Sequence, residues 1–262
     1  MNNQPIGIFD SGIGGLSILG EIKSLLPNEH LIYIGDTAYL PYGTKSKQII
    51  SERANKICKY LLSKNCKSIV VACNTATSAA IHELRSSFSV PIIGIEPAIK
   101  PARLRTQSRI IGILATEATL GGDKLQALKQ KFGQDIKILH QACSGLVEEI
   151  ELGDRQSQFL HDLIETYVEP LIKQGVDTLV LGCTHFPLIK DLIQKYAGDS
   201  VRVIDPSLSV ASELKRQLDI KNIGRKGGSG TTTCFQTGNN KTFETFIKKS
   251  NLNYGSPNLI TP

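Results

Sequence analysis

Short apolar segments alternate along the chain with longer segments in which apolar residues recur every three or four positions. The longer segments, such as residues 47–64 and 158–175, have the pattern of helices that bury one face. Several short segments are apolar on both faces, as strands are in a parallel sheet that helices cover on both sides. We predict strands at residues 6–10, 31–36, 68–73, 91–95, 109–115, 135–140, 177–183, 201–205 and 231–237.

This alternation of strands and helices predicts an α/β fold. In such folds a ligand binds beyond the carboxyl ends of the parallel strands. Polar and small residues that directly follow a predicted strand are therefore the first candidates for a functional site.

The chain resembles itself in two places. The segment RIIGILATEATLGG (109–122) echoes PIGIFDSGIGGLS (5–17), and TLVLGCTHFPLI (178–189) echoes SIVVACNTATSAA (68–80). The two offsets are similar, at 105 and 110 residues. We therefore predict two related halves in a pseudo-twofold relation, each a doubly wound α/β unit.

The composition is that of a globular protein, with 40% hydrophobic and 21% charged residues among 262. The net charge of +6 is modest, and the basic residues are scattered except for a mild cluster at Lys221, Arg225 and Lys226. No basic helix with interleaved aromatic residues occurs, so we expect no nucleic-acid partner. The positive balance suits a small acidic substrate.

The first residues, MNNQPIGIFD, lack the charged and apolar regions of a signal peptide. No apolar run reaches the about 18 residues that span a membrane, so we expect no membrane partner. The six cysteines include no C-x-x-C pair, and the chain is long for a disulfide scaffold. We therefore expect reduced thiols and a cytoplasmic location.

A Gly-rich turn, DSGIGG (10–15), follows the first predicted strand. It matches the dinucleotide-binding pattern G-x-G-x-x-G only in part, because Ser17 replaces the third glycine, although Asp36 lies near the place of a ribose-binding acid. A tight turn with glycines at positive φ is the alternative. Asp10 is a candidate because a carboxylate at a buried strand end is costly unless it is paired or lies in a cleft. Capping the next helix is an equally good explanation for it.

The loop GDTAYLPYGTKS (35–46) is rich in turn-forming and polar residues. Pro41, Tyr42 and Gly43 would fix a rigid turn whose backbone N–H groups can meet an anion. A plain connection between a strand and a helix is the alternative.

Two cysteines at corresponding places in the two halves are the strongest candidates. Cys73 and Cys183 each follow an apolar strand and precede a predicted helix start. The partial positive charge of a helix N-terminus lowers the pKa of a thiol from its free value of about 8.5. Each cysteine is followed by short polar or basic side chains: Asn74, Thr75, Thr184 and His185.

Zinc binding by Cys73, Cys183, His185 and Asp10 is a weaker alternative. The ligand types fit, but only Cys183 and His185 form a close pair in the sequence. The remaining cysteines lack a comparable context, and we interpret them as packing residues: Cys58, Cys66, Cys143 and Cys234.

Two thiols on opposite faces of a substrate carbon can invert a stereocentre. One thiolate removes a proton from one face while the other thiol delivers a proton to the opposite face. The reverse reaction exchanges the two roles. No cofactor is needed if the site stabilises the carbanion-like transition state.

The motifs DSGIGGLS, GDTAYLPYGTKS, ACNTATSAA and GCTHFPL resemble, in this order, those of the bacterial glutamate racemases, which belong to a cofactor-independent superfamily of aspartate and glutamate racemases. The segment TTTCFQTGNNKTF resembles the final strand and helix of that family. The resemblance implies two α/β domains, residues 1–97 with 208–262 and residues 98–207, and an active site in the cleft between them. It also implies L-/D-glutamate as substrate, neither PLP nor metal, a homodimer, and a role in supplying D-glutamate for peptidoglycan.

By motif, the resemblance makes Cys73 and Cys183 the acid/base pair, assisted by Asp10 and His185. The implied substrate contacts are Asp10, Ser11, Tyr42, Gly43, Asn74, Thr75, Thr184 and His185, with Pro41, Thr116, Thr119 and Glu151 as weaker candidates.

The segment CSGLVEEIELG (143–153) departs from the family pattern, which ends in a glutamate near the site. Glu151 aligns best, and Glu148 and Glu149 are alternatives. An aspartate racemase, a non-catalytic amino-acid-binding module and a zinc-dependent hydrolase are the other functions that we consider.

Overall fold

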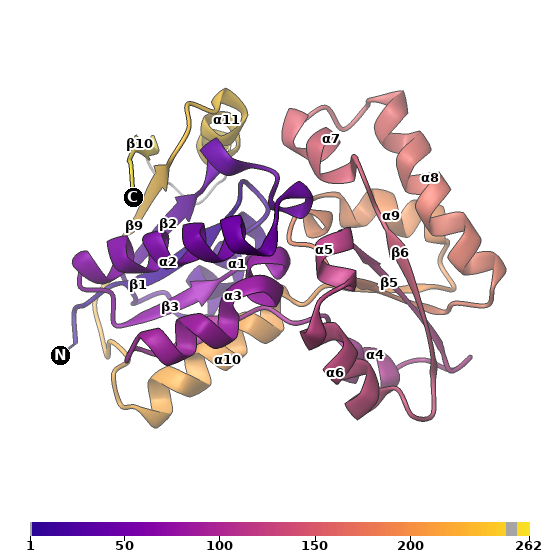
Figure 1. Cartoon of the computed structure of the whole chain (residues 1–262), viewed down its shortest axis with the longest axis horizontal. Helices are drawn as coiled ribbons and strands as arrows, with labels where there is room; N and C mark the ends of the chain where they lie inside the picture. Colours follow the sequence, from indigo (N-terminus) through magenta and orange to yellow (C-terminus); the bar gives the residue numbers. More distant parts are fainter. Residues whose placement is uncertain (1, 250–255) are drawn as a thin grey trace. The chain divides into compact units, whose positions relative to one another are not determined.

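The computed structural model describes residues 2–249 and 256–262. The chain divides into two compact units. Unit 1 comprises residues 1–95 and 207–262, and unit 2 comprises residues 96–206. The chain thus leaves unit 1 after its fourth strand and returns to it after completing unit 2, as the colours of Figure 1 show.

Unit 1 is built on a six-stranded sheet in the order β10-β9-β2-β1-β3-β4, and all neighbouring strands are parallel. The central strand β1 is buried along its whole length, in agreement with its unbroken apolar sequence. The strands are β1 (Ile6–Asp10), β2 (Leu31–Gly35), β3 (Ser68–Val71), β4 (Ile92–Gly94), β9 (Thr232–Gln236) and β10 (Asn258–Leu259).

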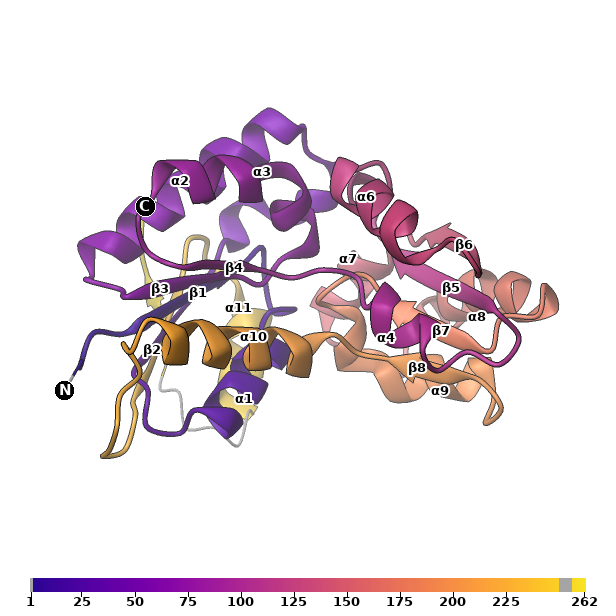
Figure 2. The same ribbon diagram turned by 90° about the horizontal axis from the view of Figure 1, so that it is seen from below.

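Helices cover both faces of this sheet. Helices α2 (Lys47–Ser63) and α3 (Asn74–Ser87) pack together on one face, and α1 (Leu16–Leu25) and α10 (Ser207–Ile220) pack together on the other (Figure 2). Helix α2 begins where the Ser46 hydroxyl accepts a hydrogen bond from the Ile49 N–H, and it buries Ile50, Ile57 and Leu61 against the sheet. Helix α11 (Lys241–Lys249) completes the unit.

Unit 2 is built on a four-stranded parallel sheet in the order β6-β5-β7-β8. Alternate residues of β5 (Ile111, Ile113 and Ala115) pack in one apolar cluster with the helices α4 (Ile99–Arg103) and α6 (Asp123–Phe132). The strands are β5 (Ile110–Ala115), β6 (Lys137–Ala142), β7 (Thr178–Leu181) and β8 (Arg202–Ile204). The helices are α4 (Ile99–Arg103), α5 (Glu117–Leu120), α6 (Asp123–Phe132), α7 (Leu146–Leu152), α8 (Gln158–Lys173) and α9 (Lys190–Ala197).

The two sheets share one strand order. The run β2-β1-β3-β4 in unit 1 corresponds to β6-β5-β7-β8 in unit 2. The similar sequence segments therefore occupy equivalent strands, β1 with β5 and β3 with β7. In each sheet the chain reverses its winding direction between these two strands, which is where doubly wound proteins bind ligands at the carboxyl edge. The predicted α/β fold with doubly wound parallel sheets is confirmed.

Several predicted segments differ from the structure at their ends. Residues 72–73 and 182–183 belong to the turns after β3 and β7, and β6 lies two residues later than expected. The loop 35–46 contains two 3-10 turns, Thr37–Tyr39 and Tyr42–Thr44, with a cis peptide bond between Leu40 and Pro41.

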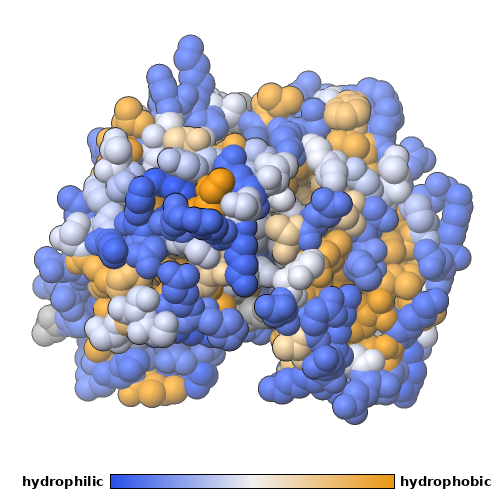
Figure 3. All heavy atoms as spheres, in the orientation of Figure 1, coloured by the Kyte–Doolittle hydropathy of each residue, from blue (hydrophilic) through white to orange (hydrophobic). Residues whose placement is uncertain are grey.

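Polar residues dominate the exposed surface, as expected from the composition. Figure 3 shows hydrophilic side chains over most of the viewed face and apolar side chains in smaller groups. Among the described residues, no helix is both long and apolar enough to cross a membrane.

Candidate active site

In unit 1 the carboxyl ends of β1 and β3 hold the predicted residues. Asp10 ends β1, Ser11 follows it, and Cys73 lies two residues beyond β3. Because β1 and β3 are neighbours in the sheet, these residues share one edge, at the point where the winding direction reverses. All three are buried, with Asp10 completely enclosed.

The Gly-rich turn after β1 is shaped by packing. Asp10 Oδ1 accepts a hydrogen bond of 2.9 Å from the Gly12 N–H, and the Tyr33 hydroxyl donates to the Gly12 carbonyl at 2.7 Å. A Cβ at Gly15 would lie 2.7 Å from the Asp10 Cβ and 2.7 Å from the Tyr33 hydroxyl. The expected positive φ is wrong, because the glycines with positive φ lie elsewhere in the described chain. Gly15 is therefore needed because Asp10 and Tyr33 lie too close to its backbone to leave room for a side chain.

Cys73 is the N-cap residue of α3. Its Sγ accepts a hydrogen bond from the Ala76 N–H at 3.5 Å, and its side chain is almost fully buried. A helix N-terminus favours negative charge, so this position stabilises a thiolate. The predicted location of Cys73 before a helix is confirmed.

Asn74 presents a buried amide next to Cys73. Only 4% of the residue is exposed, and neither Oδ1 nor Nδ2 has a hydrogen-bond partner among the described residues. A buried polar group without a partner costs about 1–3 kcal/mol, which a ligand with matching groups would offset. Thr75 is buried on the following position.

Tyr42 belongs to the same apolar cluster as Cys73. Its hydroxyl donates a hydrogen bond of 2.5 Å to Asp36 Oδ2. Arg53 of α2 donates to both carboxylate oxygens of Asp36, at 2.7 and 3.0 Å, and the Thr237 hydroxyl donates to Oδ1 at 2.7 Å. Sequence reasoning missed Arg53, a charged residue within the buried face of α2.

This network changes the interpretation of two residues. Burial and the neighbouring Asp36 raise the pKa of Tyr42 well above its usual value, so the hydroxyl stays protonated and donates to Asp36. The Tyr42 hydroxyl is therefore engaged within unit 1. Asp36 is fully buried, and its carboxylate oxygens accept hydrogen bonds from Tyr42, Arg53 and Thr237. It is therefore not available to bind a ribose.

In unit 2 the turn after β7 brings Cys183 beside His185. The Cys183 Sγ lies 3.9 Å from His185 Nδ1, and His185 Nε2 lies 2.6 Å from Glu151 Oε1 of α7. All three side chains are buried. The arrangement is a thiol, an imidazole and a carboxylate in a row, in which the carboxylate orients the ring and the ring can exchange a proton with the thiol.

The charge of His185 depends on these two neighbours. Burial alone would lower its pKa, but the contacts with Cys183 and Glu151 outweigh burial and raise the pKa well above its usual value. These two contacts therefore favour the protonated form of the imidazole.

The turn after Cys183 differs from the one after Cys73. Residues Phe186–Ile189 form a 3-10 helix with His185 as its N-cap, and α9 begins only at Lys190. Pro187 suits the first turn of this helix, where its missing N–H is not needed, and the backbone of Ile189 (φ −124°, ψ 24°) separates the turn from α9. The expected α-helix start directly after Cys183 is wrong, and His185 takes over the role of a neighbouring positive charge.

The weaker candidates of unit 2 can now be placed. Glu148 is exposed and Glu149 accepts a hydrogen bond from Ser157, so Glu151 is the glutamate that contacts His185. Thr116 caps α5, its hydroxyl lies 3.0 Å from that of Thr119, and both follow β5.

Thr184, between Cys183 and His185, is buried. In unit 1, Pro41 and Gly43 flank Tyr42 in the loop after β2.

The remaining cysteines have the features of packing residues. Burial raises the pKa of Cys58, Cys66 and Cys234 to about 12, so they stay neutral thiols. Burial and the charge of nearby Cys183 raise the pKa of Cys143 as well. The nearness of Cys143 to Cys183 could not be predicted from the sequence, because one follows β6 and the other follows β7.

Coordination of a metal ion needs several ligand side chains close together. Within residues 2–249 and 256–262, no three side chains of His, Cys, Asp or Glu are grouped so as to hold a metal ion.

Two doubly wound parallel sheets, each with a buried cysteine at its carboxyl edge, define an α/β protein of two similar units. The sequence matches the family described as Asp/Glu/Hydantoin racemase over residues 14–214. The chain belongs to this family, and the resemblance noted in the sequence is confirmed.

Curated relatives carry a more specific name. A glutamate racemase of Ectopseudomonas mendocina is 49% identical over 218 residues, which is 83% of each chain. A glutamate racemase of Methylococcus capsulatus is 47% identical over 218 residues, covering 83% of this chain and 80% of the relative.

Solved structures agree with these relatives. A glutamate racemase isoform from Bacillus anthracis matches with a TM-score of 0.90 at 31% identity, over 100% of this chain and 98% of the other. The Francisella tularensis glutamate racemase in complex with D-glutamate matches with a TM-score of 0.86 at 30% identity, again over 100% and 98%. An aspartate racemase from Picrophilus torridus, 17% identical over 86% of this chain and 96% of the other, shares the fold with a TM-score of 0.57.

Proposed function

We propose that this protein is a glutamate racemase that interconverts L- and D-glutamate by a two-cysteine proton transfer at Cα. The observation that carries the proposal is the equivalent placement of Cys73 and Cys183. Each is a buried thiol two residues beyond the third strand of its sheet, in sheets of the same order. The names of the relatives supply the substrate.

The reaction needs a balanced pair of proton transfers. One cysteine, as thiolate, takes the α-proton and becomes a thiol. The other, as thiol, gives its proton to the opposite face of Cα and becomes the thiolate. The product leaves with the inverted configuration, and the reverse reaction starts from this second protonation state.

The neighbours of each thiol tune these transfers. The helix N-terminus at α3 favours negative charge at Cys73, and the His185 imidazole, held by Glu151, lies where it can exchange a proton with Cys183. Asp10, at the same edge as Cys73, assists that thiol.

Polar groups around the cysteines bind the amino acid. The Asn74 amide supports this role most directly, because neither Oδ1 nor Nδ2 has a partner among the described residues. A carboxylate could accept a hydrogen bond from Nδ2, and an ammonium group could donate one to Oδ1. The proposed substrate contacts are Asp10, Ser11, Tyr42, Gly43, Asn74, Thr75, Thr184 and His185, with Pro41, Thr116 and Thr119 as weaker ones.

We further infer that the reaction uses neither PLP nor a metal ion, since the acid/base groups belong to the chain itself. The product D-glutamate would supply peptidoglycan synthesis in the cytoplasm of a bacterium. The functional form is proposed to be a homodimer, which sedimentation of the purified protein tests.

The central test removes each thiol separately. Cys73→Ala and Cys183→Ala are each expected to lower the racemisation rate by at least about 10³-fold, because one face of Cα loses its acid/base group. Circular dichroism of glutamate follows the rate in both directions. In D₂O, a variant that keeps the correct base can still exchange the α-proton of one enantiomer.

Cys234→Ala is the matched control, since Cys234 is equally buried and lies outside the proposed site. It is expected to keep near-normal activity. Full activity in either Cys73→Ala or Cys183→Ala would refute the two-base mechanism.

The substrate is tested separately. L-glutamate and L-aspartate are compared at equal concentration, and faster turnover of aspartate would replace the proposal by an aspartate racemase. Binding of glutamate without any exchange at Cα would indicate a non-catalytic module.

A further inference from the structure

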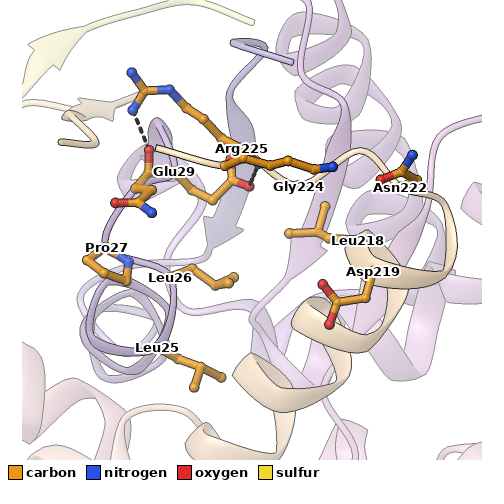
Figure 4. Close-up of a pocket in the computed structure, with 11 residues that line it drawn as sticks. Leu25, Leu26, Pro27, Glu29, Leu218, Asp219, Asn222, Gly224 and Arg225 are labelled. Carbon is orange, nitrogen blue, oxygen red and sulfur yellow. Dashed lines mark hydrogen bonds between the residues drawn. The ribbon is translucent and has the colours of Figure 1, made fainter. Parts of the chain in front are cut away.

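A pocket lies in unit 1 at the amino edge of the sheet. Its volume is about 270 Å³. It is lined by the ends of α1 and α10, by the turn that leads into β2, and by the loop after α10 (Figure 4). Asp10 and Cys73 lie at the carboxyl edge of the same sheet, so the pocket is separate from them.

The acidic side chains of this pocket are already engaged. Glu29 forms a buried ion pair of 2.5 Å with Lys67, and its other oxygen accepts a hydrogen bond from the Arg225 backbone N–H at 2.7 Å. Asp219 pairs with Lys215 at 2.6 Å. These two carboxylates are therefore neutralised by cations that do not line the pocket.

The basic side chains are not neutralised in this way. The Arg225 guanidinium donates only to neutral oxygens, those of Asn28, Ser229 and Asn3. Three of its five N–H groups are used, which leaves two for a ligand. Lys226, on the pocket wall, and Lys221, in the same loop, form no ion pair with any described residue. This is the basic cluster that the sequence showed and that the proposed reaction does not use.

The rest of the lining is apolar or amide. Leu26 and Leu218 point toward the same open space from the ends of the two helices in Figure 4. The Asn222 amide on the wall has no hydrogen bond to a described residue, and its φ of 51° fixes it in the left-handed region. A ligand here meets an apolar floor, an amide and uncompensated positive charge.

We propose that this pocket binds a small organic anion, a phosphate or a carboxylate attached to a short apolar group. The lysines and the remaining guanidinium N–H groups outweigh the partial negative charge at the carboxyl ends of α1 and α10 and favour an anion, and the leucines accept its apolar part. The volume is just below the range of about 300–1,000 Å³ usual for drug-sized ligands, so the ligand is small.

The test is a titration of the ¹⁵N-labelled full chain followed by NMR, in the presence of saturating D-glutamate. The probes are phenyl phosphate and phenylacetate, with inorganic phosphate and benzyl alcohol as the charge-only and apolar-only comparisons. We expect saturable shifts at residues 218–226 with phenyl phosphate or phenylacetate, and weaker binding of both comparisons. The stronger of the two anions identifies the head group.

Two variants test the charge. Lys226→Glu reverses one charge, and Asn222→Asp adds one with almost no change of shape at a position where Asp tolerates the left-handed backbone. Each is expected to weaken binding roughly fivefold or more. Lys56→Glu, at an exposed lysine of α2, is the matched control and is expected to bind as the unmodified chain does.

The proposal is overturned if residues 218–226 show no saturable shift, if Lys56→Glu weakens binding as much as Lys226→Glu, or if benzyl alcohol binds as tightly as the anions. Because the shifts are mapped to these residues, the result does not depend on whether the protein racemises glutamate.

Discussion

At the scale of single residues, His185 shows how a buried imidazole can stay charged. The ring is 1% exposed and makes contacts on both nitrogens, with Cys183 on one side and Glu151 on the other. Desolvation opposes its charge, and the two acidic neighbours support it. Removing one neighbour should therefore change both the titration and the stability of the protein.

We predict that Glu151→Gln lowers the pKa of His185, because an amide cannot compensate the imidazolium charge. NMR titration of the histidine ring protons measures the pKa directly. Glu149→Gln is the control, since Glu149 bonds Ser157 and does not contact the ring. An unchanged His185 pKa in Glu151→Gln would contradict the assignment.

The same pKa predicts how stability depends on pH. The folded chain holds the His185 proton more tightly than the unfolded chain, whose histidine pKa is about 6.5. The stabilisation is therefore fully present below about pH 6.5 and is lost as the pH rises through the folded pKa. Urea unfolding across this window should show a smaller loss in Glu151→Gln than in the unmodified chain.

The sequence alone could not choose among Glu148, Glu149 and Glu151. All three lie within one short helix, and a shift of one residue in its packing would bring another to the ring. Asn74 and Thr75, in contrast, follow directly from the position of Cys73, because a helix N-terminus after a strand fixes the next residues at the same edge.

At the scale of elements, the turn between β1 and α1 depends on Gly15. A side chain there would press on Asp10 and on the Tyr33 hydroxyl, which in turn holds the Gly12 carbonyl. The turn, Asp10 at the end of β1 and the Tyr33 ring of β2 thus pack tightly together.

Gly15→Ala should lower the free energy of unfolding by about 1–3 kcal/mol, the usual cost of overpacking, and should displace Asp10. Chemical denaturation measures the first effect. Gly121→Ala is the matched control, because a Cβ there meets only the Glu117 carbonyl at 3.6 Å and its φ is −78°. Equal stability of both variants would contradict the packing argument.

The apolar runs located the strands well but not their ends. Each of β3 and β7 stops before its cysteine: the N–H groups of Ala72 and Gly182 make a last hydrogen bond to the neighbouring strand, and the chain then turns into a helix. The apolar periodicity does not predict these strand ends, since Ala72 and Gly182 are compatible with a strand. The 3-10 turn at Phe186–Ile189 is likewise visible only once Pro187 is considered with its neighbours.

At the scale of the whole molecule, the units share a strand order but differ in size. The internal similarity of the sequence predicted two corresponding strands in each sheet, β1 with β5 and β3 with β7, and the apolar runs predicted the other common strands. It could not predict which edge β9 extends, because edge pairing depends on the path of the connecting chain. In the structure β9 pairs with β2 and carries β10 beside it.

We predict that residues 207–249 unfold with residues 6–94 and not with residues 110–204. Their buried side chains, such as Leu214 and Phe243, belong to unit 1. Native-state hydrogen exchange in low denaturant, read by mass spectrometry, should place α10 and β9 in the same cooperative group as β1 and β3. Exchange of α10 and β9 together with β5 and β7 would contradict this.

The pairing of β9 with β2 also has a consequence for synthesis on the ribosome. Every strand of the β5–β8 sheet leaves the ribosome before Thr232 does, so the half that carries Cys183 can close while the half that carries Cys73 still lacks β9. During that interval β2 presents an open edge, with unpaired backbone groups that can join another chain. The unit whose first strands are made first is thus the last to complete its sheet.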